Sequence, residues 1–111
     1  MQYIDINEQQ ILLDDEGYLL NLDDWSEALA HRLAEQDGVT LTDAHWEILK
    51  VVREFYQTYD LSPAMRPLVK AVKQSLGEDK GKSIYLMKLF SESPAKQSAR
   101  YAGLPKPANC L

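Results

Sequence analysis

The sequence predicts an α+β fold: one mostly helical domain of four to five helices, with a small N-terminal β-hairpin or meander and an extended C-terminal arm. Three observations lead to this prediction. Short apolar runs separated by turn residues are confined to residues 2–21. From there to residue 101, apolar residues recur at helical spacing. Two prolines then fall within the last eight residues, which excludes a helix there and favours an extended, semi-rigid chain.

The N-terminal region contains three short β-type runs, at residues 3–6, 11–13 and 18–20, with turn-forming polar residues between them. A hairpin alone is marginally stable in water, so we expect this one to pack against the helices that follow. The first of these helices should begin near Asp24, because Asp24 and Glu27 have the spacing of a capping box. The pair Asp37-Gly38 should end it.

The second helix is predicted from Thr42, as its N-cap, to Tyr59. Its apolar residues step by three or four along the whole segment, which indicates a central core helix whose buried stripe includes Phe55 and Tyr59. The segment Asp60-Leu61-Ser62-Pro63 should end it. Further helices are predicted at about residues 67–76 and 80–90, and a short fifth helix should start at Pro94.

We therefore divide the chain into a domain of residues 1–103 and a mobile arm of residues 104–111. Within the domain, residues 1–21 form the hairpin region and residues 22–103 the helices. A chain of 111 residues is one domain in length and needs no disulfide or metal to fold.

Charge is distributed unevenly along the chain, although its net value is only −5. Residues 1–60 carry a net charge of −11 and residues 61–111 a net charge of +6. The basic half fits either a surface for an anionic partner (nucleic acid or an acidic protein) or an ordinary solvated face. Five lysines on the third and fourth predicted helices also loosely suggest a helix-turn-helix that binds nucleic acid: Lys70, Lys73, Lys80, Lys82 and Lys88.

Several function classes are excluded or disfavoured by composition. One cysteine and two histidines are too few for a Cys/His zinc site unless a second chain supplies ligands, and we expect no metal and no cofactor. No apolar run is long enough to span a membrane, and the N-terminus does not have the pattern of a signal peptide, so we expect a cytoplasmic protein. His45, at the start of the second helix, is better explained by packing on the hairpin than by catalysis.

The only candidate nucleophile is Cys110, the second-last residue. A thiol on a terminal arm can enter the active site of another protein, which a core thiol cannot do. The alternative is an inert thiol on a frayed tail. The carboxylate of Leu111 disfavours the thiolate, whereas Lys106 and Arg100 would favour it if the arm folds back.

The terminal run RYAGLPKPANCL, at residues 100–111, closely resembles the C-terminal arm of the DsrC/TusE family. Inner segments also resemble the family's motifs in the same order: LTDAHWEI at 41–48, REFY at 53–56, PAMRPL at 63–68 and YLMKLF at 85–90. The resemblance implies that Cys110 carries sulfur. Family members that partner dissimilatory sulfite reductase have a second cysteine eleven positions earlier, where this chain has Ala99.

The lone cysteine indicates the TusE-like branch of the family. The resemblance to that branch implies a sulfurtransferase that accepts persulfide sulfur from a TusBCD-like complex. It also implies that the sulfur passes to an MnmA-like tRNA thiouridylase, which forms 2-thiouridine at the tRNA wobble position. Lys106 and Arg100 match basic arm positions, and their support of Cys110 is our own hypothesis. The alternatives are a DsrC-like partner subunit of sulfite reductase and the helix-turn-helix module.

Overall fold

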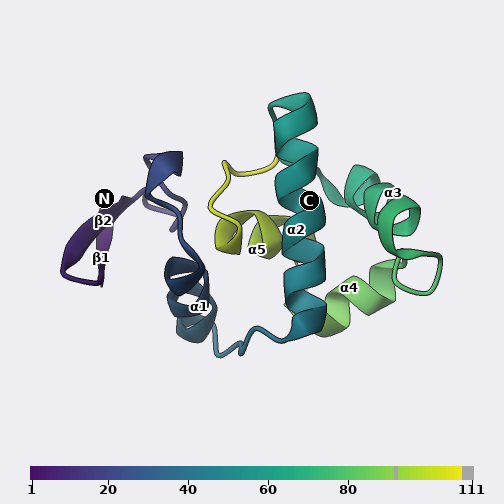
Figure 1. The fold of residues 1–111 in the computed structure, drawn as a ribbon, viewed down its shortest axis with the longest axis horizontal. Coiled ribbons are helices and arrows are strands. Elements are labelled where there is room, and N and C mark those ends of the chain that lie inside the picture. Colours follow the sequence, from purple (N-terminus) through teal and green to yellow (C-terminus); the bar gives the residue numbers. More distant parts are fainter. Residues whose placement is uncertain (92, 109–111) are drawn as a thin grey trace.

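A computed structural model of the chain describes residues 1–91 and 93–108, and over these residues it shows a two-stranded hairpin followed by five α-helices (Figure 1). The α+β prediction is confirmed. The elements are β1 (Gln2–Ile6), β2 (Gln9–Leu13), α1 (Glu27–Gln36), α2 (Asp43–Tyr59), α3 (Met65–Leu76), α4 (Ser83–Phe90) and α5 (Pro94–Tyr101), with a 3-10 turn at Leu22–Asp24.

The hairpin is closed by a two-residue turn, Asn7-Glu8, in which both residues have positive φ angles (50° and 69°). Such a turn matches the right-handed twist of the paired strands, and asparagine adopts positive φ more readily than most residues. The antiparallel register pairs Ile4 with Ile11, and both side chains are buried. The third predicted run contributes only a single bridge, between Leu13 and Leu19.

Helix α1 begins later than the sequence predicted. Its N-cap is Ser26, whose hydroxyl accepts a hydrogen bond from the Leu29 amide at 3.1 Å, so the capping box proposed at Asp24 is wrong. Asp24 belongs instead to the preceding 3-10 turn. This leaves Trp25 between the two elements, where its ring is free to contact the C-terminal part of the chain.

The start of α2 is as predicted, with Thr42 as N-cap. Nδ1 of His45 accepts a hydrogen bond from the Thr42 amide at 3.1 Å, so its Nε2 carries the proton and donates to the carbonyl of Leu89 at 2.8 Å. The His45 ring also packs edge-on against Phe90. His45 therefore joins α2 to α4, and the prediction that it packs on the hairpin is wrong.

The short helix α5, rather than α2, lies at the centre of the helical layer, because it contacts α1, α2, α3 and α4 (Figure 1). Its buried face is made largely of small residues, Ala95, Ser98 and Ala99, which let the other helices approach closely. On α4, which begins at Ser83 and not at residue 80, Leu86 and Phe90 are buried. Ile84 is 64% exposed and does not belong to the core.

Candidate functional site: the base of the C-terminal arm and the neighbouring groove

The base of the arm is held by two side chains from distant parts of the sequence. The indole nitrogen of Trp25 donates a hydrogen bond to the carbonyl of Tyr101 at 2.8 Å. The guanidinium of Arg53, on α2, donates to the carbonyl of Ala102 at 2.6 Å and lies 3.8 Å from the centre of the Trp25 ring. The last carbonyls of α5 are thus bonded to side chains of the body. The arm therefore starts from a fixed point.

Gly103 turns the chain from α5 into the arm. Its φ angle is +73°, and a β-carbon at this position would lie 2.2 Å from Cδ1 of Trp25. After this turn, the amide of Leu104 donates a hydrogen bond to the carbonyl of Ala99 at 2.9 Å, and the Leu104 side chain is buried. Glycine is required here both by the backbone conformation and by the close approach of the indole ring.

The next part of the arm lies against the body as far as Pro107. The hydroxyl of Ser62, in the loop between α2 and α3, donates to the carbonyl of Pro105 at 2.6 Å. The ammonium of Lys106 contacts a carboxylate oxygen of Glu16 at 2.7 Å, and Pro107 is buried. These contacts place residues 104–107 on the domain in this structure. The mobility that we expect for residues 104–111 stays a prediction.

The predicted site residues are placed as follows. Cys110 lies outside the described residues, so its role stays a prediction. Arg100 is largely buried and pairs with the carboxylate of Asp37, which also accepts a hydrogen bond from the Tyr101 hydroxyl at 2.6 Å. Burial and the Asp37 carboxylate raise the pKa of Tyr101. Arg100 and Lys106 therefore both have carboxylate partners on the body. Their support of the thiolate also remains a prediction.

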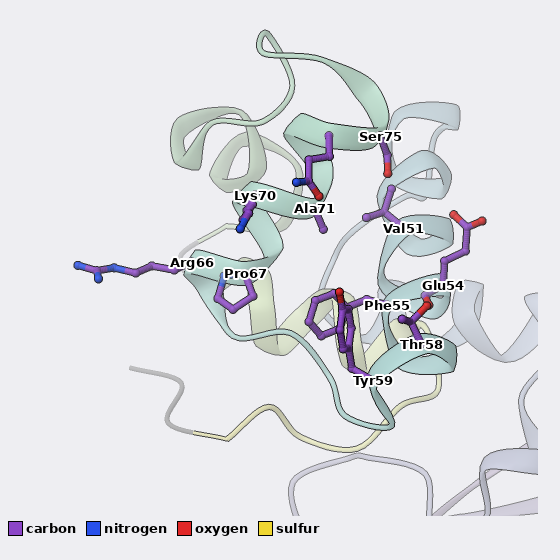
Figure 2. Close-up of a pocket in the computed structure, with 11 residues that line it drawn as sticks. Val51, Glu54, Phe55, Thr58, Tyr59, Arg66, Pro67, Lys70, Ala71 and Ser75 are labelled. Atoms are coloured by element: carbon purple, nitrogen blue, oxygen red, sulfur yellow. The ribbon is translucent and has the colours of Figure 1, made fainter.

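A groove of about 640 Å³ lies between α2 and α3, beside the loop that holds the arm (Figure 2). Phe55 and Tyr59 of α2 form one end of it, with ring centres 4.6 Å apart, and Tyr59 is 60% exposed. The sequence had placed both rings in the core stripe of this helix, which is wrong for Tyr59. Arg66 and Lys70 of α3 lie on the opposite wall, and both are exposed.

Neither a metal-binding cluster nor a membrane-spanning helix is present among the described residues. Residues 1–91 and 93–108 contain no group of three His, Cys, Asp or Glu side chains placed to hold a metal ion. Over the same part of the chain, no helix is long and apolar enough to cross a membrane.

Sequence reasoning missed the residues that hold the arm: Trp25, Arg53 and Ser62. Trp25 falls inside the helix predicted to begin near Asp24, but the helix starts after it, and Ser62 was assigned only to a helix break. Their partners lie 76, 49 and 43 residues away in the sequence, so no local spacing could indicate the contacts.

The sequence and the fold together define a small helical domain with one thiol near the end of an arm whose base is fixed. The chain belongs to the DsrC-like protein family, since the model of that family, described as DsrC like protein, matches residues 5–111. Three relatives carry the name sulfurtransferase TusE or TusE homolog. The protein of Sodalis glossinidius is 53% identical and covers 97% of this chain and 100% of the relative. That of Haemophilus influenzae is 52% identical over 97% and 99%. That of Yersinia pestis is 58% identical over 88% and 90%.

Solved structures with the same fold bear DsrC names. The DsrC of Allochromatium vinosum superimposes with a TM-score of 0.89 at 48% identity, covering 98% of this chain and 97% of the other. The oxidized gamma-subunit of the dissimilatory sulfite reductase of Archaeoglobus fulgidus gives 0.85 at 32% identity, over 99% and 100%. The identification of the family from its motifs is confirmed, and the chain is a sulfurtransferase of this family.

Proposed function

We propose that this protein is a cytoplasmic sulfur carrier. It accepts persulfide sulfur on Cys110 from a TusBCD-like donor complex and passes it to an MnmA-like thiouridylase, for 2-thiouridine formation at the tRNA wobble position. The observation that carries the proposal is the single cysteine at the second-last position of a chain whose relatives are named sulfurtransferase TusE.

The chemistry needs only one thiolate on this chain. The thiolate of Cys110 attacks the outer sulfur of the donor's persulfide, the donor's sulfur–sulfur bond breaks, and the donor leaves as a thiolate. One sulfur–sulfur bond forms and one breaks, so no external oxidant or reductant is needed. Transfer to a thiol of the acceptor repeats the same exchange. No second cysteine in the chain can attack the new persulfide and discharge the sulfur early.

The anchored base of the arm supports delivery into a partner's active site. Six residues, 105–110, follow the last buried residue of the turn, and a fully extended chain of that length spans roughly 20 Å. Because Trp25 and Arg53 hold the base, little conformational entropy remains to be lost there when the tip enters a pocket. The two prolines restrict the tip in the same way.

A DsrC-like role as a partner subunit of dissimilatory sulfite reductase is the second candidate. It is favoured by the similarity to a solved structure described as the gamma-subunit of that enzyme. Against it stands Ala99, which is fully buried in α5 in the position where the resemblance implies a second cysteine. Co-purification with such an enzyme, with Cys110 never carrying sulfur, would support this candidate.

The test is mass spectrometry of the intact chain after incubation with a persulfide-loaded donor complex. We expect the mass to rise by one sulfur atom, the addition to map to Cys110, and a reductant to remove it. In a reconstituted reaction with thiouridylase and tRNA, Cys110→Ser should abolish 2-thiouridine formation.

The control variant Ala108→Cys/Cys110→Ser keeps one thiol on the arm but moves it by two residues. It should be alkylated as readily as the wild type and yet support little thiolation, since the thiol must reach a fixed depth in each partner. The proposal fails if Cys110→Ser restores tRNA thiolation as well as the wild type does.

A further inference from the structure

We infer that the groove between α2 and α3 is the surface on which the persulfide donor docks, through an acidic segment that also presents an apolar side chain. The inference rests on the proposed function, and it adds the place and the chemistry of recognition. The groove is lined by residues of only these two helices and has a volume of about 640 Å³ (Figure 2).

The exposed groups of the groove are those that protein interfaces favour. Aromatic residues and arginine are enriched in interfaces relative to other protein surface. Here Tyr59 is 60% exposed although it continues the apolar stripe of α2, and Leu61, in the loop that joins α2 to α3, is 55% exposed. Among the described residues, neither Arg66 nor Lys70 forms a salt bridge, whereas Lys73 and Lys80 of the same half are paired with glutamates. The α3 side of the groove thus has two cations without a salt bridge among the described residues: Lys70 on its wall, and Arg66 at its edge with a side chain that extends away from the groove (Figure 2).

The position of the groove relative to the arm explains why a sulfur-transfer partner would meet it. The loop between α2 and α3 joins the two walls of the groove, and its Ser62 holds the carbonyl of Pro105 at 2.6 Å. Only four residues lie between Pro105 and Cys110, so the Cα of Cys110 cannot lie farther than roughly 18 Å from the Cα of Pro105 while this contact is made. A partner large enough to receive the thiol in a pocket must therefore cover the surface around this loop.

The charge of the groove favours the donor over the acceptor. An enzyme that holds tRNA needs a cationic surface around its active site to bind the phosphates. Such a surface would be repelled by Arg66 and Lys70, whereas a donor has no such requirement and can carry carboxylates opposite them. Direct docking of RNA is less favoured, because the chain has a net charge of −5 and the groove also contains Glu54.

The test is the rate at which the persulfide-loaded donor complex transfers sulfur to Arg66→Glu/Lys70→Glu. Both residues are exposed, and Arg66 lies in the first turn of α3, where a glutamate is favourable for the helix, so the variant should fold. We expect kcat/KM for loading Cys110 to fall at least about tenfold. Added salt should slow the wild type toward the rate of the variant. The matched control, Lys82→Glu/Lys88→Glu, makes the same charge change at the N-cap and in the last turn of α4, outside the groove, and should load at the wild-type rate.

A small persulfide, glutathione persulfide, separates docking from chemistry, because it needs no docking surface. It should load the groove variant and the wild type equally. If the donor complex loads both equally as well, the docking inference is wrong while the proposed function stands. If neither reagent places sulfur on wild-type Cys110, the proposed function itself fails. The inference is also overturned if the groove variant loses affinity for fluorescein-labelled tRNA in the absence of other proteins, since the groove would then bind RNA.

Discussion

Replacing Gly103 by alanine should destabilise the domain much more than the same change at Gly38. Both glycines end a helix with nearly the same backbone angle, φ +73° at Gly103 and +74° at Gly38. They differ in their surroundings. An added β-carbon would lie 2.2 Å from the Trp25 ring at Gly103, whereas nothing lies within 4 Å of it at Gly38. The pair therefore separates backbone strain from the steric contact that holds the arm.

The expected magnitudes follow from what each substitution disturbs. An alanine with positive φ costs about 1 kcal/mol, and this is the whole expected effect of Gly38→Ala. Gly103→Ala must also displace Trp25. Losing its hydrogen bond leaves the carbonyl of Tyr101 without that donor, at about 1–3 kcal/mol. The stacking of Arg53 on the indole contributes about 0.5–1 kcal/mol more. The total is about 2.5–5 kcal/mol, a large share of the 5–15 kcal/mol typical of a domain's stability.

The assay is urea denaturation followed by far-ultraviolet circular dichroism, which does not depend on the environment of the displaced indole. The free energy of unfolding should fall by at least about 1.5 kcal/mol more in Gly103→Ala than in Gly38→Ala. Equal losses in the two variants would refute the reasoning, because they would mean that the Trp25 contact adds nothing to the strain of the turn.

Two further predictions concern the neighbourhood of the arm. Because the folded state raises the pKa of Tyr101, the unfolded chain ionises first, and stability present below about pH 10 should be lost as pH rises. Tyr101→Phe should be less stable than the wild type at neutral pH, because it lacks the hydrogen bond to Asp37. Its free energy of unfolding, measured by urea denaturation at several pH values, should fall less between neutral and high pH than that of the wild type. Removing the hydroxyl in Ser62→Ala should free Pro105, so that carboxypeptidase trims the C-terminus faster. The control is Thr58→Ala, because the Thr58 hydroxyl bonds only the carbonyl of Glu54 in its own helix, and the trimming rate of this variant should be unchanged. Equal trimming rates in the two variants would contradict the anchoring role of Ser62.

Local signals in the sequence predicted most elements of the fold. The alternating runs indicated the hairpin, the apolar stripe starting at Thr42 indicated α2, and Pro94 indicated the start of α5. Such signals involve residues within a few positions of one another, which is the range over which propensities and capping act. They were ambiguous where two caps compete. Asp24 and Ser26 both suit an N-cap; the structure uses Ser26, and Trp25, just before it, bonds the distant carbonyl of Tyr101.

The same distinction between local signals and tertiary packing applies to the candidate site. The thiol at Cys110 was found because a lone cysteine at the second-last position is a feature of the sequence itself. The groove was not predicted from the sequence, because helical periodicity assigns Tyr59 to the buried stripe of α2. Periodicity cannot show that α3 leaves this ring uncovered. Burial depends on which neighbour reaches a residue, and periodicity contains no information about neighbours.

The sequence by itself thus determined the fold class, the family and the residue that we propose to carry sulfur. Only the tertiary structure decided that α5 is the central helix and that Trp25, Arg53 and Ser62 hold the arm. The physical reason is distance along the chain. Each of these contacts joins segments more than forty residues apart, and it exists only after the helices have packed.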